Sequence, residues 1–453
     1  MKYGQKERLG IIVWMMVLIS LSVYTGCKLS MGGDSVADNE QDTGFARDIE
    51  RVSIASAGSQ ANGDSEAPSI SSDGRIVAFI SDATNLVAGD TNGAQDVFVH
   101  DLDTGTTERV SVASAGTQAN DDVFTLSLSA NGRFVAFGSY ATNLVAGDTN
   151  AVIDVFVHDR DTAATERVSV ASAGTQANDE SVSPAISSNG RFVAFQSDAT
   201  NLVLIDTNNK SDIFVHDRLT GSTERVSVAS DGTQANGDSI SPAISSDGRF
   251  VAFASEASNL VAGDTNNRAD IFLHDRQNDT TERIVGPAEF NTAGGTIIVA
   301  PAIGPDGGFL GFRSNADDLV PGDTNNSFDT FMVDGDTLIS ERLSVSSGAV
   351  QGNADSSQPA ISSNNRYAAF SSIATNLVLQ DTNGSEDVFV RDRDAGKTRR
   401  VSIAFDGAEG DDDSFSAVIS GNGRYVAFTS FAENLVANDT NGVLDIFVIP
   451  NPF

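Results

Sequence analysis

A unit of about 58 residues recurs seven times in this chain, and this regularity constrains the fold more than any other feature. Each copy carries an arginine followed by an apolar residue and, in most copies, a serine. These arginines are Arg51, Arg109, Arg167, Arg225, Arg283, Arg342 and Arg400, spaced by 58 residues with one interval of 59. Self-similarity at a fixed period is typical of solenoids and propellers. No linker interrupts the series, so we expect residues 48–453 to form one domain.

One copy shows four segments with the composition of short strands, here called A to D. Strand A is predicted at 242–245, strand B at 249–255, strand C at 270–274 and strand D at 281–285. An Asp-Gly pair between A and B supplies the positive φ that a tight hairpin needs. Strand B is apolar on both faces, which indicates a sheet covered on both sides. Four short strands per repeat predict the blade of a β-propeller.

The two ends of the repeat series complement each other. The first strand D, Arg51–Ala55, has no strands A to C before it, and the last A-B-C set, 417–448, has no strand D after it. A solenoid would be expected to carry distinct caps at both ends. The sequence therefore predicts an all-β, seven-bladed propeller of four-stranded blades, closed by the N-terminal strand completing the last blade.

The repeat also resembles a known family. The segment Ser241–Phe253, SPAISSDGRFVAF, is similar to the repeat of TolB-like propellers, a WD40-like family often called PD40. The resemblance covers all seven copies and implies the propeller fold. It does not imply one activity, because the family includes translocation components, peptidase propellers and other envelope proteins. The similarity to TolB itself is confined to its propeller, which argues against a role in the Tol system.

The N-terminal segment has the pattern of an export signal. Basic residues precede an apolar run from Leu9 to Val23, and small residues lead to Cys27, the only cysteine. This pattern resembles a bacterial lipoprotein signal (residues 1–27), although Tyr24 stands where leucine is usual. It predicts lipidation of Cys27, a flexible polar tether at 28–47 and an exported, lipid-anchored protein of the cell envelope. Ordinary cleavage, or retention of the short apolar run as an anchor, are the alternatives.

The net charge of -34 limits the classes of partner. Nucleic acids and anionic lipid surfaces require basic patches, so they are disfavoured. Cations or basic proteins are more compatible with this charge. An acidic surface that only keeps an exported protein soluble is the alternative explanation.

Each repeat contains an Asp-x-Asn pair followed, four residues after the Asn, by another Asp. The members are Asp90, Asn92 and Asp96; Asp148, Asn150 and Asp154; Asp206, Asn208 and Asp212; Asp264, Asn266 and Asp270; Asp323, Asn325 and Asp329; Asp381, Asn383 and Asp387; and Asp439, Asn441 and Asp445. These B–C loops should share one face with the D–A loops, which contain Gln-Ala-Asn segments. Their oxygens could bind Ca²⁺, the one candidate cofactor, although the third acidic position and the distal Glu of calcium loops are missing. Alternatively, they form Asx-turns that build the loop.

Two other series recur at fixed positions. His100, His158, His216 and His274 each end a strand C, one per blade, so they cannot converge on one metal, and we expect a structural role. Six arginines follow the A–B turns and are expected to pair with carboxylates such as Asp217. These are Arg75, Arg133, Arg191, Arg249, Arg366 and Arg424.

The fifth copy differs from the others. It has residues 290–295 in place of Gln-Ala-Asn, Arg313 near the end of strand B, and Asp317 and Asp318 shortly after. These residues could form a partner-binding site, or they could reflect drift in a robust repeat.

No catalytic motif is present in the sequence: there is no G-x-S-x-G elbow, no H-E-x-x-H pair and no Gly-rich phosphate loop. We therefore expect a non-enzymatic, monomeric scaffold that binds envelope proteins, with or without calcium. The alternative is a carbohydrate-active hydrolase or lyase that uses acidic residues of the loop face. Unlike polar groups around a central pocket would favour the enzyme, and a plain seven-fold funnel would favour the scaffold.

Overall fold

The computed structural model describes residues 49–265, 268–284 and 297–453. The chain divides into two compact units, residues 1–40 and 41–453, and the fold described here is that of the second unit. The export signal with Cys27, the tether, Asn266 and residues 290–295 lie outside the described residues. In the described ranges, no helix is long and apolar enough to cross a membrane.

Seven antiparallel sheets of four strands make up the fold. Blade 1 holds β2 (Ser65–Ile70), β3 (Ile76–Ser81), β4 (Asp96–Asp101) and β5 (Thr106–Arg109); blade 2 holds β6 (Val123–Leu128), β7 (Phe134–Ser139), β8 (Asp154–Asp159) and β9 (Ala164–Arg167). Blade 3 holds β10 (Ser181–Ile186), β11 (Phe192–Ser197), β12 (Asp212–Asp217) and β13 (Ser222–Arg225); blade 4 holds β14 (Ser239–Ile244), β15 (Phe250–Ser255), β16 (Asp270–Asp275) and β17 (Thr280–Arg283). Blade 5 holds β18 (Ile297–Ile303), β19 (Phe309–Ser314), β20 (Asp329–Asp334) and β21 (Ser340–Arg342); blade 6 holds β22 (Ala360–Ile361), β23 (Tyr367–Ser372), β24 (Asp387–Asp392) and β25 (Lys397–Arg400). Blade 7 holds β26 (Ser414–Ile419), β27 (Tyr425–Ser430), β28 (Asp445–Pro450) and β1 (Glu50–Arg51).

The ring closes as the sequence predicts. Strand β1 pairs antiparallel with β28, with Glu50 opposite Val448 and Arg51 opposite Phe447. The closing strand is shorter than the predicted Arg51–Ala55. The chain leaves the ladder after Arg51, and the Ser53 hydroxyl then donates to Asp445 at 2.5 Å. The seven-bladed, all-β prediction is confirmed.

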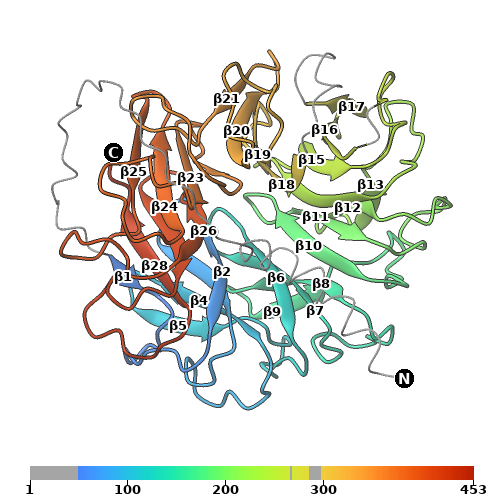
Figure 1. Cartoon of the computed structure of the whole chain (residues 1–453). Helices are drawn as coiled ribbons and strands as arrows, with labels where there is room; N and C mark the ends of the chain where they lie inside the picture. The colour runs from blue at the N-terminus through green and yellow to red at the C-terminus, as the bar shows by residue number, and fades with distance from the viewer. Residues whose placement is uncertain (1–48, 266–267, 285–296) are drawn as a thin grey trace, which may run out of the picture. The chain divides into compact units, whose positions relative to one another are not determined.

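Strand A of each blade lines the centre of the ring, because it is the edge strand of its sheet and contacts the strands A of neighbouring blades. Figure 1 shows β2, β6, β10, β18 and β26 turned toward the centre and the strands D at the periphery. The B–C and D–A loops share one side of the ring, here called the upper face. The A–B and C–D turns share the lower face.

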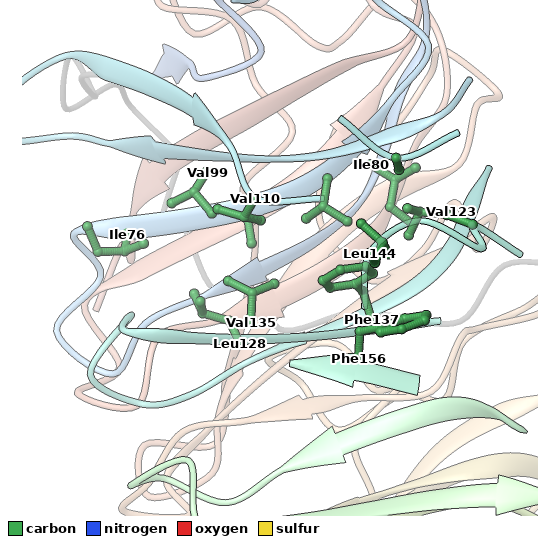
Figure 2. Close-up of a cluster of buried hydrophobic side chains, with 14 residues drawn as sticks. Ile76, Ile80, Val99, Val110, Val123, Leu128, Val135, Phe137, Leu144 and Phe156 are labelled. Atoms are coloured by element: carbon green, nitrogen blue, oxygen red, sulfur yellow. The ribbon is translucent and has the colours of Figure 1, made fainter. Parts of the chain in front are cut away.

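The apolar core lies between the blades. Strands B and C of each blade bury a phenylalanine pair, such as Phe79 and Phe98 with ring centroids 6.0 Å apart. Figure 2 shows one interblade cluster, in which Ile80 and Val99 of blade 1 belong to the same apolar group as Val135 and Phe137 of blade 2. This packing explains why strand B is apolar on both faces, since one face meets each neighbouring blade.

On the lower face, successive blades interlock through an aromatic ring and a glycine. Phe134 lies against Gly190 of the next blade so closely that a Cβ there would come within 2.1 Å of the ring. Gly190 also has φ +73°, which glycine adopts without strain. The guanidinium groups of Arg133 and Arg218 lie 4.8 and 4.5 Å from the same ring. The ring of Phe134 in blade 2 therefore packs against a glycine of blade 3 and contacts one arginine of each blade.

Five of the six arginines after the A–B turns pair with carboxylates as predicted, with Arg75 at 3.6 Å from Asp101. Among the described residues no carboxylate pairs with Arg424, because Pro450 stands where other blades have the aspartate that ends strand C. Arg191 donates from Nε and Nη2 to both oxygens of Asp217, at 2.8 and 2.7 Å. The bidentate arrangement recurs for Arg133, Arg249 and Arg366.

Candidate functional site

The Asp-Thr-Asn loops of the upper face are held by an arginine of strand D. In blade 1, Arg109 Nη1 lies 2.9 Å from Asp90 Oδ1 and 3.1 Å from Asp96 Oδ2. The Asn92 amide nitrogen donates to Asp96 at 2.8 Å and to a carbonyl of the following loop at 3.0 Å. Ser111 donates to the other oxygen of Asp96 at 2.5 Å. Two carboxylates thus share one guanidinium, an arrangement here called the Asp–Arg–Asp triad.

The triad recurs in every blade. Its members are Asp148, Arg167 and Asp154; Asp206, Arg225 and Asp212; Asp264, Arg283 and Asp270; Asp323, Arg342 and Asp329; Asp381, Arg400 and Asp387; and Asp439, Arg51 and Asp445. Asn150, Asn208, Asn325, Asn383 and Asn441 repeat the contact of Asn92, whereas Asn266 lies outside the described residues. The sequence analysis treated the arginines only as repeat markers. In blades 1 to 6 their offset of 13 residues from the second Asp is the signal that could have revealed the triad.

These residues do not fit a calcium ion. The positive charge between the two carboxylates belongs to the arginine, and the Asn side chain turns a donor, not an oxygen, toward the second Asp. Its oxygen accepts from a backbone amide two residues on, as for Asn208 and Lys210 at 3.2 Å. Within the described ranges no three His, Cys, Asp or Glu side chains are grouped to hold a metal. The contacts support the Asx-turn interpretation.

One guanidinium does not fully compensate two buried carboxylates. Burial and the neighbouring Asp387 raise the pKa of Asp381 to about 6, although Arg400 opposes the shift. The pKa values of Asp148, Asp206 and Asp439 are raised for the same reasons, and that of Asp323 is raised by burial and by Asp317.

The D–A and B–C loops share the upper face, as the sequence predicts, and hydrogen bonds join them. In blade 1, the Asn62 amide donates to Thr84 at 3.0 Å and the Asn85 amide to the Gln60 carbonyl at 2.8 Å. Asp317 and Asp318 take the places of Thr84 and Asn85 in blade 5. Asp317 is exposed, whereas Asp318 is half-buried with its pKa raised by burial and by Asp317.

The four histidines are structural, as expected. Each is buried and bonds through Nδ1 to a threonine of strand D, as His100 does to Thr107 at 2.9 Å. Burial lowers the pKa values of His100, His158, His216 and His274. The contact links the two outer strands of one blade, and the four sites remain separate.

Against this uniform framework, four positions of the repeat differ from blade to blade. They lie where strand A begins, strand B ends and strand C begins, at the upper edge of each blade, and are here called the inner ring. Near the start of strand A they are Glu66, Phe124, Val182, Ile240, Ser357 and Phe415. At the penultimate residue of strand B they are Ile80, Gly138, Gln196, Ala254, Arg313, Ser371 and Thr429. Directly after strand B they are Asp82, Tyr140, Asp198, Glu256, Asn315, Ile373 and Phe431, and directly before strand C they are Gln95, Ile153, Ser211, Ala269, Phe328, Glu386 and Leu444.

Blades 1 and 3 carry an acidic sector, defined as the inner-ring residues Glu66, Asp82 and Asp198 together with Glu180, which directly precedes strand A of blade 3. Burial and neighbouring carboxylates raise the pKa of each member. Among the described residues, none of the four is ion-paired with an arginine or lysine. Tyr140 approaches Glu180 at 3.4 Å, and burial together with this carboxylate raises its pKa to about 12. The acidic sector therefore differs from the triads, whose carboxylates share arginines.

Blades 6 and 7 place an apolar sector beside it, defined as Ile373, Phe415 and Phe431. Ile373 and Phe431 are 47% and 43% exposed, and the rings of Phe415 and Phe431 lie 6.2 Å apart. Strand β26 of blade 7 contacts β2, which carries Glu66. The apolar and acidic sectors are thus neighbours.

Arg313 belongs to a separate group between blades 5 and 6. Its guanidinium lies 3.7 Å from Asp355 and 4.3 Å from the ring centroid of Phe328. Glu386 accepts a hydrogen bond from Ser371 at 2.5 Å, and burial raises its pKa. The sequence analysis singled out Arg313 with Asp317 and Asp318, but missed Asp355, Phe328 and Glu386. Comparing the copies position by position would have exposed Phe328 and Glu386.

Comparison with known proteins shows the fold alone. No family model and no curated protein matches this chain. An oligogalacturonate lyase from Vibrio parahaemolyticus is similar with a TM-score of 0.53 and 14% identity over 90% of this chain and 97% of its own. An oligogalacturonate lyase in complex with manganese gives the same TM-score and identity over 89% and 93%. TolB from Acinetobacter baumannii, with a TM-score of 0.41 and 14% identity, is covered over 63% of its length and 72% of this chain.

Proposed function

We propose that this protein is a non-enzymatic binding scaffold of the cell envelope whose partner protein contacts the inner ring. The observation that carries the proposal is the contrast between the inner ring and the rest of the repeat. Side chains that build blades, such as the triad of Asp90, Arg109 and Asp96, are the same in every copy. Inner-ring side chains differ in charge and size at four positions. If these four positions served only to build the blades, we would expect the same side chain at each position in every blade.

Exposure supports the same assignment. Large apolar side chains such as Phe431 contribute little to folding where they face solvent, and exposed apolar groups rimmed by polar ones are typical of interaction sites. The charged side chains of the inner ring are acidic except for Arg313. The ring therefore carries opposite charges on different blades, which would orient a bound partner. Lipid anchoring through Cys27 would hold this surface in the envelope.

Charge reversal at the inner ring tests the scaffold. We expect Arg313→Glu to lose partners that the parent protein retains in pull-downs from envelope extracts. Arg75→Glu is the matched control, because Arg75 is a half-exposed arginine on the lower face. Unchanged partners for Arg313→Glu, with the fold intact by circular dichroism, would contradict the assignment of Arg313.

The anchor needs its own test. A palmitate analogue should label the full-length protein in bacterial cells, and Cys27→Ser should abolish the label. Labelling that does not depend on Cys27 would overturn the lipoprotein proposal.

A carbohydrate-active hydrolase or lyase is the second candidate. The observation that favours it is the presence of two inner-ring carboxyls, Glu66 on blade 1 and Glu386 on blade 6, whose raised pKa values suit a general acid. The fold shared with oligogalacturonate lyases is compatible with such an activity, but an anionic sugar would meet the acidic sector. Product formation from neutral oligosaccharides that Glu386→Gln abolishes would support the enzyme, and no product from any substrate would exclude it.

A further inference from the structure

The inner ring combines two properties that point to one class of partner. The apolar sector lies on blades 6 and 7 and the acidic sector on blades 1 and 3, and the two sectors meet where blade 7 contacts blade 1. We propose that they receive a segment of a partner protein in which lysine or arginine stands next to large apolar side chains. This inference rests on the proposed scaffold function and specifies its ligand.

The first argument is the charge balance. Each triad carboxylate shares an arginine, and lower-face carboxylates such as Asp217 have bidentate partners. The acidic sector has no such internal cation among the described residues. Its members instead repel one another within each blade, as Asp82 does with Glu66 and Asp198 does with Glu180. A cation supplied by a partner would relieve this repulsion, so binding a basic group is favourable there.

The second argument is the apolar surface beside the carboxylates. Ile373 and Phe431 occupy the position that holds Asp82, Asp198 and Glu256 in other blades, so two adjacent blades present apolar groups where three others present acids. On the other side of blade 1, Phe124 and Tyr140 form an edge-to-face pair with centroids 5.3 Å apart. Glu66 and Asp82 therefore lie on a blade with aromatic pairs on both neighbouring blades.

The third argument excludes simpler cations. An inorganic divalent ion seeks six or more oxygen ligands, and among the described residues no three His, Cys, Asp or Glu side chains are grouped to hold one. Aromatic rings add nothing to its binding through oxygen. They do attract the long cationic side chains of lysine and arginine, whose charge can lie over a ring while the methylene stem packs on apolar surface. A polypeptide segment supplies both features in one molecule.

The test uses the purified full-length protein and three fluorescein-labelled peptides. One alternates lysine with leucine, the second replaces lysine with glutamate, and the third replaces leucine with serine. Fluorescence anisotropy should show binding of the first peptide, weakened by added salt, and at least about tenfold weaker binding of the other two. Equal binding of the serine peptide would show that only charge matters and would overturn the proposal.

Variants locate the peptide on the ring. We expect the double variant Glu66→Gln and Asp82→Asn to weaken binding at least about tenfold, and Phe431→Ala about fivefold. Asp161→Asn and Phe405→Ala are the matched controls, because both residues are well exposed but lie outside the inner ring. Controls as damaging as the ring variants would contradict the location.

The scaffold function and the basic-segment inference predict different outcomes for these variants. If Arg313→Glu loses an envelope partner but no basic peptide binds, the scaffold stands and the basic-segment inference falls. If neither the ring variants nor Arg313→Glu changes any interaction, both fall.

Discussion

Arg225 and Asp212 form an ion pair of 3.1 Å between Nη1 and Oδ2, with side chains only 9% and 1% exposed. The same guanidinium lies 3.3 Å from Asp206. The pair is therefore part of a buried group of one cation and two anions, and its removal affects stability more than a surface pair would.

We predict that Arg225→Gln lowers the free energy of unfolding by about 3 kcal/mol, because two buried carboxylates lose their cation. Arg75→Gln is the control. Its carboxylate partners Asp101 and Asp103 are 3.6 Å away, and the arginine is half-exposed, so the expected loss is below about 1 kcal/mol. Urea unfolding of both variants measures the difference. Equal losses would contradict the role of the triad.

Calcium should have no effect on the parent protein, because each triad already contains a cation. We predict the same melting temperature with millimolar calcium and with a chelator, and no heat of calcium binding in calorimetry. A melting temperature that rises with calcium would restore the metal hypothesis for the Asp-Thr-Asn loops.

The pKa of Asp381 predicts a distinctive pH dependence. Its folded pKa of about 6 lies above the ordinary value of 3.8, so the folded state binds its proton more tightly than the unfolded state. The contribution of this group to stability is thus largest below about pH 4 and is lost as pH rises through 6. Asp381→Asn should gain about 2 kcal/mol relative to the parent between pH 4 and 7.

Asp275 provides a control of opposite sign. Bidentate contact with Arg249 lowers its pKa to about 2, so its stabilising contribution is present above about pH 4 and lost as pH falls through 2. The stability of Asp275→Asn relative to the parent should therefore rise as the solution is acidified. Parallel pH profiles for the two variants would refute both assignments. Comparing each variant with the parent also removes the contribution of the buried histidines.

Gly190 and Gly174 separate backbone strain from interblade packing. Both have positive φ, +73° and +80°, but an added Cβ at Gly190 collides with Phe134 whereas none lies near Gly174. We predict a loss of about 1 kcal/mol for Gly174→Ala from backbone strain alone. Gly190→Ala should lose a further 1–3 kcal/mol, roughly the cost of overpacking. Similar losses in urea unfolding would mean that the packing of Phe134 on Gly190 does not contribute to stability.

The sequence predicted the fold well because the repeat period, the Asp-Gly turns and the unmatched ends are all local or countable patterns. It placed strand C at 270–274 and strand B at 249–255, within one residue at each end of the observed Asp270–Asp275 and Phe250–Ser255. It was less successful at strand A, predicted at 242–245 and observed at Ser239–Ile244. A register shift with Ser241 at φ 54° lets this strand begin three residues earlier.

The site could be predicted only in part, because its groups come from different blades. The Asp-x-Asn pattern was visible, but the arginine that neutralises it comes from a neighbouring strand, so two interpretations stayed open. Arg313 was identified as unusual, yet its neighbour Asp355 lies in the next blade and 42 positions away. A comparison of the copies predicts that Arg313 and Asp355 are neighbours only if the copies are first placed around a closed ring.

The two-residue closing strand determines how the ring responds to force. The chain that precedes β1 enters the propeller at its closure, so tension applied through residue 49 reaches β1 before any other strand. Only Glu50 and Arg51 pair there, but Arg51 also holds Asp439 at 2.6 Å and Asp445 at 3.1 Å. Under tension, these ion pairs must break before the seventh blade opens. Opening the ring at this point therefore requires the loss of the Arg51 ion pairs together with the bonds from the Val52 amide to Ile446 and from the Ser53 hydroxyl to Asp445.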